Sequence, residues 1–324
     1  MKLCKKTGHR APVNAFASLR RERPERFMDH CITFCRAPEL VNPYMLIGYR
    51  GWLNAGEISA GSIDYLRRLL GARRFAYIEP QSFYIWQVPG YDPSQIMRPY
   101  TVVEAGIVKS VGEPTNDFYF WKSAAGNDLI LFTGHEPNLA WPQFAAAILS
   151  VAKRYHVRRL FTLGAIFDRV PHTRETGFYA VLSLAEMKRE FHQFPLLSYS
   201  GPSSFSTLLM DYAARENLEA ASIVARIPPY IQTFNEKIAY EVLSRILAHT
   251  SLDIDLGDLK KTGDMVTELM NRDFRQSKES MAHLRKLEEL YDTASLQGHG
   301  LHEAAISELM QEMVVAKKGG RKPH

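Results

Sequence analysis

Side chains that could carry out acid–base chemistry and bind anions cluster between Asp168 and Arg174. This cluster follows a short apolar run over 159–163 that predicts a buried strand. Asp168 could orient His172, whose unperturbed pKa lies near neutrality. Arg174 could bind a carboxylate or a phosphate, and Thr173 adds a hydroxyl beside it. The same side chains could instead tie a long loop to its own backbone, so functional and structural roles are both open.

A glycine-rich loop after the first predicted strand is a second candidate site. It contains Gly51, Asn54 and Glu57, between a predicted strand over 44–49 and a predicted helix over 57–70. Backbone N–H groups in such a turn can bind an anion, but the loop lacks the Lys-Ser/Thr pair of a P-loop. Alternatively, the glycines allow tight turns and close packing of helix on strand, and Asn54 caps the helix.

A third candidate loop contains Gly134, Glu136 and Asn138 and follows a predicted strand over 128–133. Glu136 could act as a general base, anchor a ligand or accept hydrogen bonds from free backbone N–H groups. The chain has no Gly-x-Ser-x-Gly elbow and no cysteine partner, so a hydrolase triad is not indicated. The sequence therefore assigns no catalytic residue, and an enzyme is the less favoured hypothesis.

Strands alternate with helices along most of the chain, which predicts an α/β fold with a doubly wound, mostly parallel sheet. Open α/β sheets bind ligands at the carboxyl ends of their strands, so we expect the three loops to share one cleft. The loop after 159–163 is expected to begin at Gly164. Residues 80–126 interrupt the alternation with antiparallel pieces, and only helical stripes follow residue 256. The other predicted strands are 75–78, 106–111, 118–121 and 218–227, and the other predicted helices are 141–155, 181–194, 203–216 and 235–248.

The composition predicts a globular protein with basic ends. The 324 residues are 46% hydrophobic, and no apolar run approaches the length of a membrane span. No signal peptide pattern opens the chain, so we expect a cytoplasmic protein. The net charge is +5, but 41–316 holds 27 basic and 31 acidic residues, so the excess lies in the two ends. Solvated ends are favoured over contact with nucleic acid.

The cysteines indicate neither a disulfide scaffold nor a metal site. Cys4, Cys31 and Cys35 are the three cysteines, and an odd number fits a reducing compartment. Together with His9 and His30 they lack the second pair that zinc spacing requires. Cys31 and Cys35 would lie one turn apart in a helix. No metal and no cofactor are expected.

Four motifs occur in order at Tyr49–Gly56, Gly134–Trp141, Leu163–Arg174 and Tyr199–Ser203. Together they resemble the proteasome assembly chaperone 2 family, in its bacterial and archaeal branch. The resemblance implies a core similar to the nucleoside phosphorylase/hydrolase-like fold, a C-terminal helical part and self-association. The family's usual Pro-His-Tyr stands here as Pro228-Pro229-Tyr230, so any role of that histidine is absent.

The sequence predicts a basic, partly disordered extension over 1–40, an α/β domain over 41–250, a helical region over 251–316 and a disordered tail over 317–324. The main hypothesis is a homo-oligomeric, assembly-chaperone-like or binding protein that has a protein partner. The alternative is an enzyme or binding protein for an anionic or nucleoside-like small molecule. Its cleft would lie between the loops of Asn54, Glu136 and His172.

Overall fold

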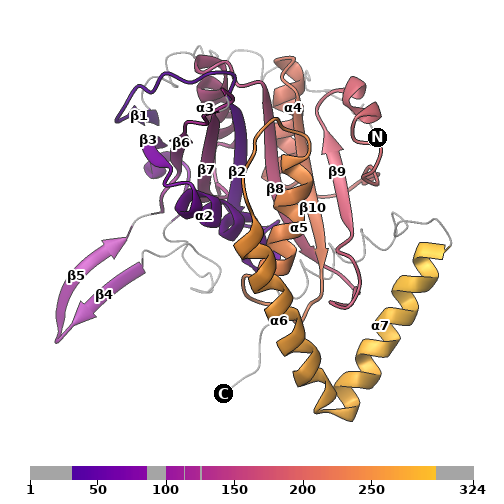
Figure 1. The fold of residues 1–324 in the computed structure, drawn as a ribbon. Coiled ribbons are helices and arrows are strands. Elements are labelled where there is room, and N and C mark those ends of the chain that lie inside the picture. Colours follow the sequence, from indigo (N-terminus) through magenta and orange to yellow (C-terminus); the bar gives the residue numbers. More distant parts are fainter. Residues whose placement is uncertain (1–30, 86–99, 113, 125, 297–324) are drawn as a thin grey trace, which may run out of the picture.

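The computed structural model of the chain describes residues 31–85, 100–112, 114–124 and 126–296. A mixed sheet forms its centre (Figure 1). In spatial order the strands are β1 (Ile32–Phe34), β3 (Arg73–Ile78), β6 (Asp117–Trp121), β7 (Leu129–His135), β2 (Tyr44–Arg50), β8 (Arg159–Phe167), β10 (Ala220–Ile227) and β9 (Phe178–Leu182). The neighbours β7, β2, β8 and β10 run parallel, and the pairs outside this group are antiparallel.

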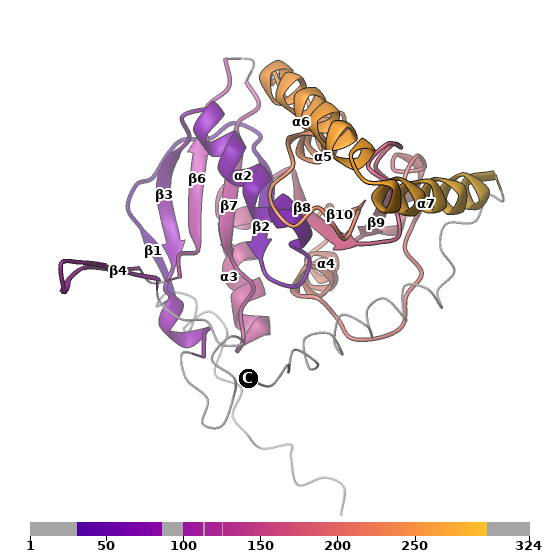
Figure 2. The ribbon, with the colours of Figure 1, turned by 90° about the horizontal axis from the view of Figure 1, so that it is seen from below.

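Helices cover both faces of the sheet, so the fold is doubly wound as predicted (Figure 2). The four helices of the core are α2 (Ile58–Leu69), α3 (Trp141–Arg154), α4 (Phe205–Arg215) and α5 (Glu236–Leu247). Strand β2 shows how both faces are filled, because successive side chains point to opposite sides. Leu46 packs with the apolar residues of α2 and α5, and Ile47 packs with those of α3 and α4.

The predicted ends of these four helices agree with the structure to within two residues. Local capping explains why they could be read from the sequence. Gly71 follows α2 with a left-handed φ of 57°, a conformation that glycine adopts at little cost. The side chains of Ser204 and Asn235 accept hydrogen bonds from the first turns of α4 and α5.

The helix predicted over 181–194 is wrong. The structure has strand β9 followed by a short 3-10 helix over Ala185–Arg189. Apolar residues of this segment nevertheless belong to the core, since Met187, Phe191 and Phe194 are all buried. Strand β9 forms because it pairs antiparallel with β10, a contact distant in sequence that overrides the local pattern.

Two further strand boundaries differ from the predictions. Strand β8 continues to Phe167, because 164–167 pair in parallel register with the end of β10, so the loop begins at Asp168 rather than Gly164. Strand β1 lies inside the predicted N-terminal extension and pairs with β3. Cys31 and Cys35 flank β1, so they do not lie one turn apart on a common helix, and the first is buried while the second is exposed.

A two-stranded hairpin projects from the body (Figure 1). It consists of β4 (Tyr100–Glu104) and β5 (Ile107–Gly112), and among the described residues it pairs with no other strand. Ala105 and Gly106 both have positive φ, at 48° and 79°, which is the conformation of a two-residue hairpin turn. The prediction of antiparallel pieces in this part of the chain is therefore confirmed.

Two long helices follow the core. In α6 (Gly257–Arg275), a Cβ on Gly263 would lie 2.6 Å from the Cα of Lys237, so glycine allows α6 to approach α5 closely. Gln276 and Ser277 connect α6 to α7 (Lys278–Leu296), and the two helices diverge in a V (Figure 1). The helical stripes predicted after residue 256 continue over 301–313, which lies outside the described residues. None of the helices in the described ranges is long and apolar enough to cross a membrane.

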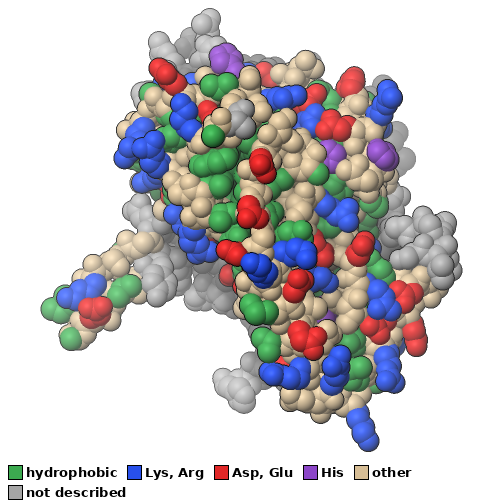
Figure 3. Space-filling model, viewed as in Figure 1, with side chains coloured by type: hydrophobic (Ala, Val, Ile, Leu, Met, Phe, Trp, Pro, Cys, Tyr) green, Lys and Arg blue, Asp and Glu red, His purple; other side chains and the backbone are tan. Residues whose placement is uncertain are grey.

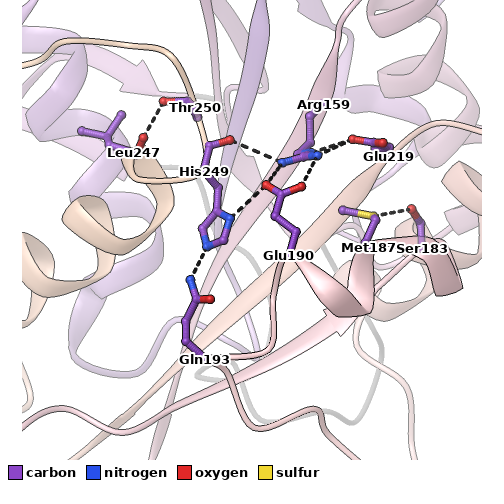
Figure 4. A network of polar contacts seen from close by, with 9 residues as sticks. All are labelled: Arg159, Ser183, Met187, Glu190, Gln193, Glu219, Leu247, His249 and Thr250. Atoms are coloured by element: carbon purple, nitrogen blue, oxygen red, sulfur yellow. Dashed lines mark hydrogen bonds and ion pairs between the residues drawn. The ribbon is translucent and has the colours of Figure 1, made fainter.

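A network of charged side chains lies where the parallel strands begin (Figure 4). Arg159, at the start of β8, donates to Glu190 at 2.5 Å and to Glu219 at 2.5 Å. His249, just after α5, contacts Glu190 through Nδ1 at 3.1 Å and stacks on Phe191. Hydrogen bonds from Arg159 lower the pKa of Glu190, which favours its ionised form, and the network ties the end of α5 to the sheet far from the polar loops.

Candidate functional site

The three polar loops all leave the same edge of the sheet. The parallel strands β2, β7, β8 and β10 end there at Arg50, His135, Phe167 and Ile227. The three loops therefore lie at strand ends, as predicted. The contacts of each side chain show what it does there.

Glu136 holds two loops and a helix together. Its Oε2 accepts a hydrogen bond from the backbone N–H of Trp52 at 2.6 Å, and its Oε1 accepts one from Phe205 at 2.9 Å. Gly51 packs on this side chain, because a Cβ at that position would lie 2.4 Å from the Cβ of Glu136. Both carboxylate oxygens therefore serve backbone donors, which is the structural alternative foreseen for this residue.

The neighbours of Glu136 are also held internally. A Cβ on Gly134 would lie 2.6 Å from Oδ1 of Asn116, so the strand end requires glycine for close approach. The side chain of Asn138 accepts a hydrogen bond from the backbone N–H of Ile85 at 3.2 Å. The loop of Gly134, Glu136 and Asn138 is thus part of the packing around the end of β7.

Asn54 fixes the start of α2. Its Oδ1 accepts a hydrogen bond from the backbone N–H of Ala60 at 3.0 Å, and its backbone bridges to Ala165 of β8. Glu57 is exposed and has a left-handed φ of 54°. Gly48 lets the helix approach, since a Cβ there would lie 2.4 Å from the carbonyl oxygen of Ser59. These contacts support the close-packing interpretation of the glycine-rich loop.

Asp168 pairs with a cation on the neighbouring strand. Its Oδ2 accepts from Nε of Arg226 at 2.5 Å, and its Oδ1 accepts from the backbone N–H of Arg169 at 2.7 Å. The Asp168 side chain is 1% exposed and that of Arg226 is 16% exposed. This ion pair links β8 to β10, and the carboxylate serves Arg226 rather than orienting His172.

His172 contacts two other elements through its ring. Nε2 lies 3.2 Å from Oδ1 of Asn271 on α6, and Nδ1 lies 2.8 Å from the hydroxyl of Tyr230. Because Oδ1 can only accept, Nε2 carries the proton and Nδ1 accepts from Tyr230. Burial lowers the pKa of His172 and raises that of Tyr230 to about 12, so both groups are neutral near neutral pH. The imidazole therefore joins the loop to α6.

Thr173 and Arg174 contact α7. Thr173 Oγ1 donates to Oε1 of Glu288 at 2.6 Å. Arg174 donates through Nε and Nη2 to the two carboxylate oxygens of Asp292, at 2.8 and 2.7 Å, and through Nη1 to Glu288 at 3.2 Å. This bidentate pair raises the pKa of Arg174 and lowers that of Asp292. Arg174 thus binds carboxylates, and they belong to its own chain.

A small cavity lies beside the Asp168–Arg174 loop. It has a volume of about 10 Å³, which is close to the minimum for one water molecule. His172, Arg174, Arg226 and Lys237 are among its lining residues, whereas Asn54 and Glu136 are not. Gly51 contacts Glu136, and Lys237 donates to the carbonyls of His172 and Arg174, but this cavity is not lined by all three loops. The described residues contain no group of three or more side chains that could hold a metal ion.

Several contacting residues were not found from the sequence. Arg226 and Asn271 had no motif of their own, Tyr230 was noted only within the altered Pro-Pro-Tyr motif, and α7 showed only an amphipathic pattern. The alternation of charged and apolar residues in α7 indicated a packing face, and the pairing of its acidic residues with Arg174 needed the fold. The structure defines a doubly wound α/β protein whose strand-end loops are held by internal contacts and by its C-terminal helices.

The chain belongs to the PAC2 family, whose family model matches residues 49–272. The family predicted from the four motifs is thereby confirmed. None of the curated proteins matches the chain.

Solved structures share the fold. A PAC2 family protein from Streptomyces avermitilis is 23% identical, with a TM-score of 0.64 over 75% of this chain and 99% of that chain. A protein of unknown function from Mycobacterium tuberculosis is 23% identical, with a TM-score of 0.71 over 81% of this chain and 91% of that chain. A proteasome-assembly chaperone homologue from the same organism is 20% identical, with a TM-score of 0.66 over 74% of this chain and 99% of that chain.

Proposed function

We propose that the protein is an assembly-chaperone-like binding protein that self-associates through the β4–β5 hairpin. Membership of the PAC2 family and the likeness to a proteasome-assembly chaperone homologue support protein partners. The observation that carries the proposal is the hairpin itself, which projects with aliphatic side chains exposed on its surface (Figure 3).

The hairpin has one face made of β-branched side chains. Val103 pairs with Val108, and Thr101 pairs with Val111, so these four residues lie on the same side. The register shifts next to Val103, which leaves Lys109 out of the pairing and brings Val108 and Val111 to one face. The three valines are 55–58% exposed. A two-stranded ribbon is marginal in water unless another strand or surface covers it, so this face requires a partner.

The expected strength of such an association follows from the exposed side chains. Burying the exposed part of one valine contributes about 1 kcal/mol, so six valines from two copies contribute about 6 kcal/mol. Association itself costs about 4–15 kcal/mol. The valines alone therefore offset only the lower end of this cost, so a dimer needs further contacts as well and should dissociate on dilution.

The strand-end loops favour binding over catalysis. Glu136, Asp168, His172 and Arg174 all have internal partners, and the cavity beside His172 has room for about one water molecule. No observation favours the small-molecule alternative. Catalysis would require these groups to turn from their present partners towards a substrate.

Three finer predictions belong to this proposal. A cytoplasmic location is compatible with protein partners, and a compartment-specific fluorescent fusion would test it. The domain boundaries at residues 40, 250 and 316 would be tested by limited proteolysis. The specific likeness to the nucleoside phosphorylase/hydrolase-like fold stays a prediction, to be tested by superposition on a member of that fold.

Sedimentation velocity across a dilution series tests the proposed function. The variant carries Val103→Thr, Val108→Thr and Val111→Thr, which keep the β-branched shape and the strand preference while adding a hydroxyl to each side chain. We expect wild type to form a dimer or larger oligomer and the triple variant to shift towards monomer. Val41→Thr, at a residue 52% exposed on the body, is the matched control and should sediment as wild type. A wild type that is monomeric at every concentration contradicts the proposal.

A further inference from the structure

Helix α7 contacts the Asp168–Arg174 loop through charged and polar side chains. Thr173 and Arg174 bind the carboxylates of Glu288 and Asp292, and the hydroxyl of Tyr291 donates to the carbonyl of Glu175 at 2.9 Å. Glu288 and Asp292 are four residues apart, so they lie one turn apart on the same side of the helix. The loop thus recognises a pair of carboxylates at helical spacing.

The contact between α7 and the loop is open to solvent. The side chains of Arg174 and Asp292 are 34% and 50% exposed. Leu284 and Leu287 are the buried residues among the α7 side chains that the structure describes. Exposed ion pairs contribute little to stability, because water and salt screen both charges. Another helix with the same charges could therefore compete with α7.

The loop is rigid independently of α7. The ammonium group of Lys237 donates to the carbonyl oxygens of His172 and Arg174, at 3.0 and 3.3 Å. The hydroxyl of Tyr230 accepts from the backbone N–H of His172 at 3.0 Å, and Asn271 on α6 contacts the ring of His172. A site held by its supporting contacts loses little conformational freedom on binding, which favours affinity.

The family model matches the Asp168–Arg174 loop but not helix α7, which contacts it. The matched residues, 49–272, contain the whole loop and most of α6 but end before α7. The loop is therefore part of the matched domain, whereas α7 lies outside the matched residues. Thr173 and Arg174 face an element that the family model does not include.

We propose that Thr173 and Arg174 form a binding site for a helix of a protein partner that carries two carboxylates one turn apart, and that α7 occupies this site until the partner replaces it. The charge complementarity seen in the chain identifies this partner chemistry. The proposal rests on the proposed function as a protein-binding protein and names one class of its partners.

A peptide spanning 278–296, labelled with a fluorophore, is the probe, because it reproduces the helix that the loop holds. The protein is the full chain, either wild type or carrying Glu288→Gln and Asp292→Asn, which remove the internal carboxylates. Fluorescence anisotropy should show at least tenfold tighter binding of the peptide to the double variant than to wild type. The affinity should fall as salt is added.

Two controls make the result specific to the loop. Adding Arg174→Gln to the double variant should abolish the gain, and a peptide with the same two carboxylates neutralised should bind neither protein. Hydrogen exchange should show α7 amides opening at least tenfold faster in the double variant, with β8 and β10 unchanged. Equal peptide binding to wild type and double variant, binding that survives Arg174→Gln, or no loosening of α7 would overturn the proposal. Sedimentation of the hairpin variant is independent of α7, so failure of the peptide assay leaves the proposed function separately testable.

Discussion

Replacing Glu136 by glutamine tests whether this carboxylate is a structural tie. The carboxylate accepts hydrogen bonds from the backbone N–H groups of Trp52 and Phe205, at 2.6 and 2.9 Å. A glutamine keeps one acceptor, but its NH₂ group turns a donor towards the other N–H. One backbone donor is then left without a partner, although the size and shape of the side chain are preserved.

The expected destabilisation follows from these two bonds. An unpaired, partly buried N–H costs about 1–3 kcal/mol, so we expect Glu136→Gln to lower the free energy of unfolding by about 2 kcal/mol. Glu136→Ala removes both acceptors and should cost about 4 kcal/mol. For a chain of this size, the glutamine variant should melt about 3 °C below wild type.

Urea unfolding and differential scanning calorimetry measure this effect. Glu57→Gln is the matched control, because Glu57 lies at the same edge of the sheet but is exposed, and it should leave stability unchanged. A Glu136→Gln variant as stable as wild type would refute the structural role. If anionic or nucleoside-like ligands then stabilised wild type but not the variant, the small-molecule hypothesis would be favoured instead.

Three further changes test the same description of the site. Burial, aided by Arg50, lowers the pKa of His135 from 6.5 to about 4, and burial also lowers that of His172. Below pH 6.5 these histidines bind protons in the unfolded chain but not in the folded one, so the free energy of unfolding should be complete above pH 6.5 and fall towards pH 4. For His135 alone the loss should be about 3 kcal/mol. Urea midpoints across this range measure the loss, and a flat profile would contradict it. Asp168→Asn should lower the free energy of unfolding by about 3 kcal/mol, because Arg226 loses its buried partner. Asp64→Asn, at an exposed ion pair, should lower it by less than about 1 kcal/mol. Equal losses in chemical denaturation would contradict an ion pair that holds β8 and β10 together. Gly51→Ala should cost about 1–3 kcal/mol because its Cβ meets Glu136, and an unchanged melting temperature would show that this approach is not tight.

The helices and central strands could be predicted because their signals are local. Apolar spacing and caps such as Asn235 define a helix within its own sequence. The prediction of a helix over 181–194 was wrong because Met187, Phe191 and Phe194 have a spacing that also fits an α-helix. In the structure they are buried from a 3-10 turn and the irregular segment after it. Strand β9 depends on β10, about forty residues further along the chain, and no local pattern reveals that pairing.

The position of the candidate site could be predicted, but its contacts could not. Parallel strands place their carboxyl ends at one edge, so the loops of Glu136 and Asp168 were correctly located there. Their roles depend on residues distant in sequence. Arg226 is 58 positions from Asp168, and Asp292 is 118 positions from Arg174. Charge alone made Arg174 a candidate for binding an external anion, whereas the fold supplies its carboxylates from α7.

Hydrogen exchange of the β4–β5 amides at low and high protein concentration tests most directly whether the protein self-associates through this hairpin. Among the described residues the hairpin is a two-stranded sheet, so the outward-facing amides of a monomer should exchange rapidly. We predict that the amides between Thr101 and Val111 become protected as concentration rises, while those of Leu131 in the central sheet do not change. Exchange in the hairpin that is fast at every concentration would contradict the proposed self-association.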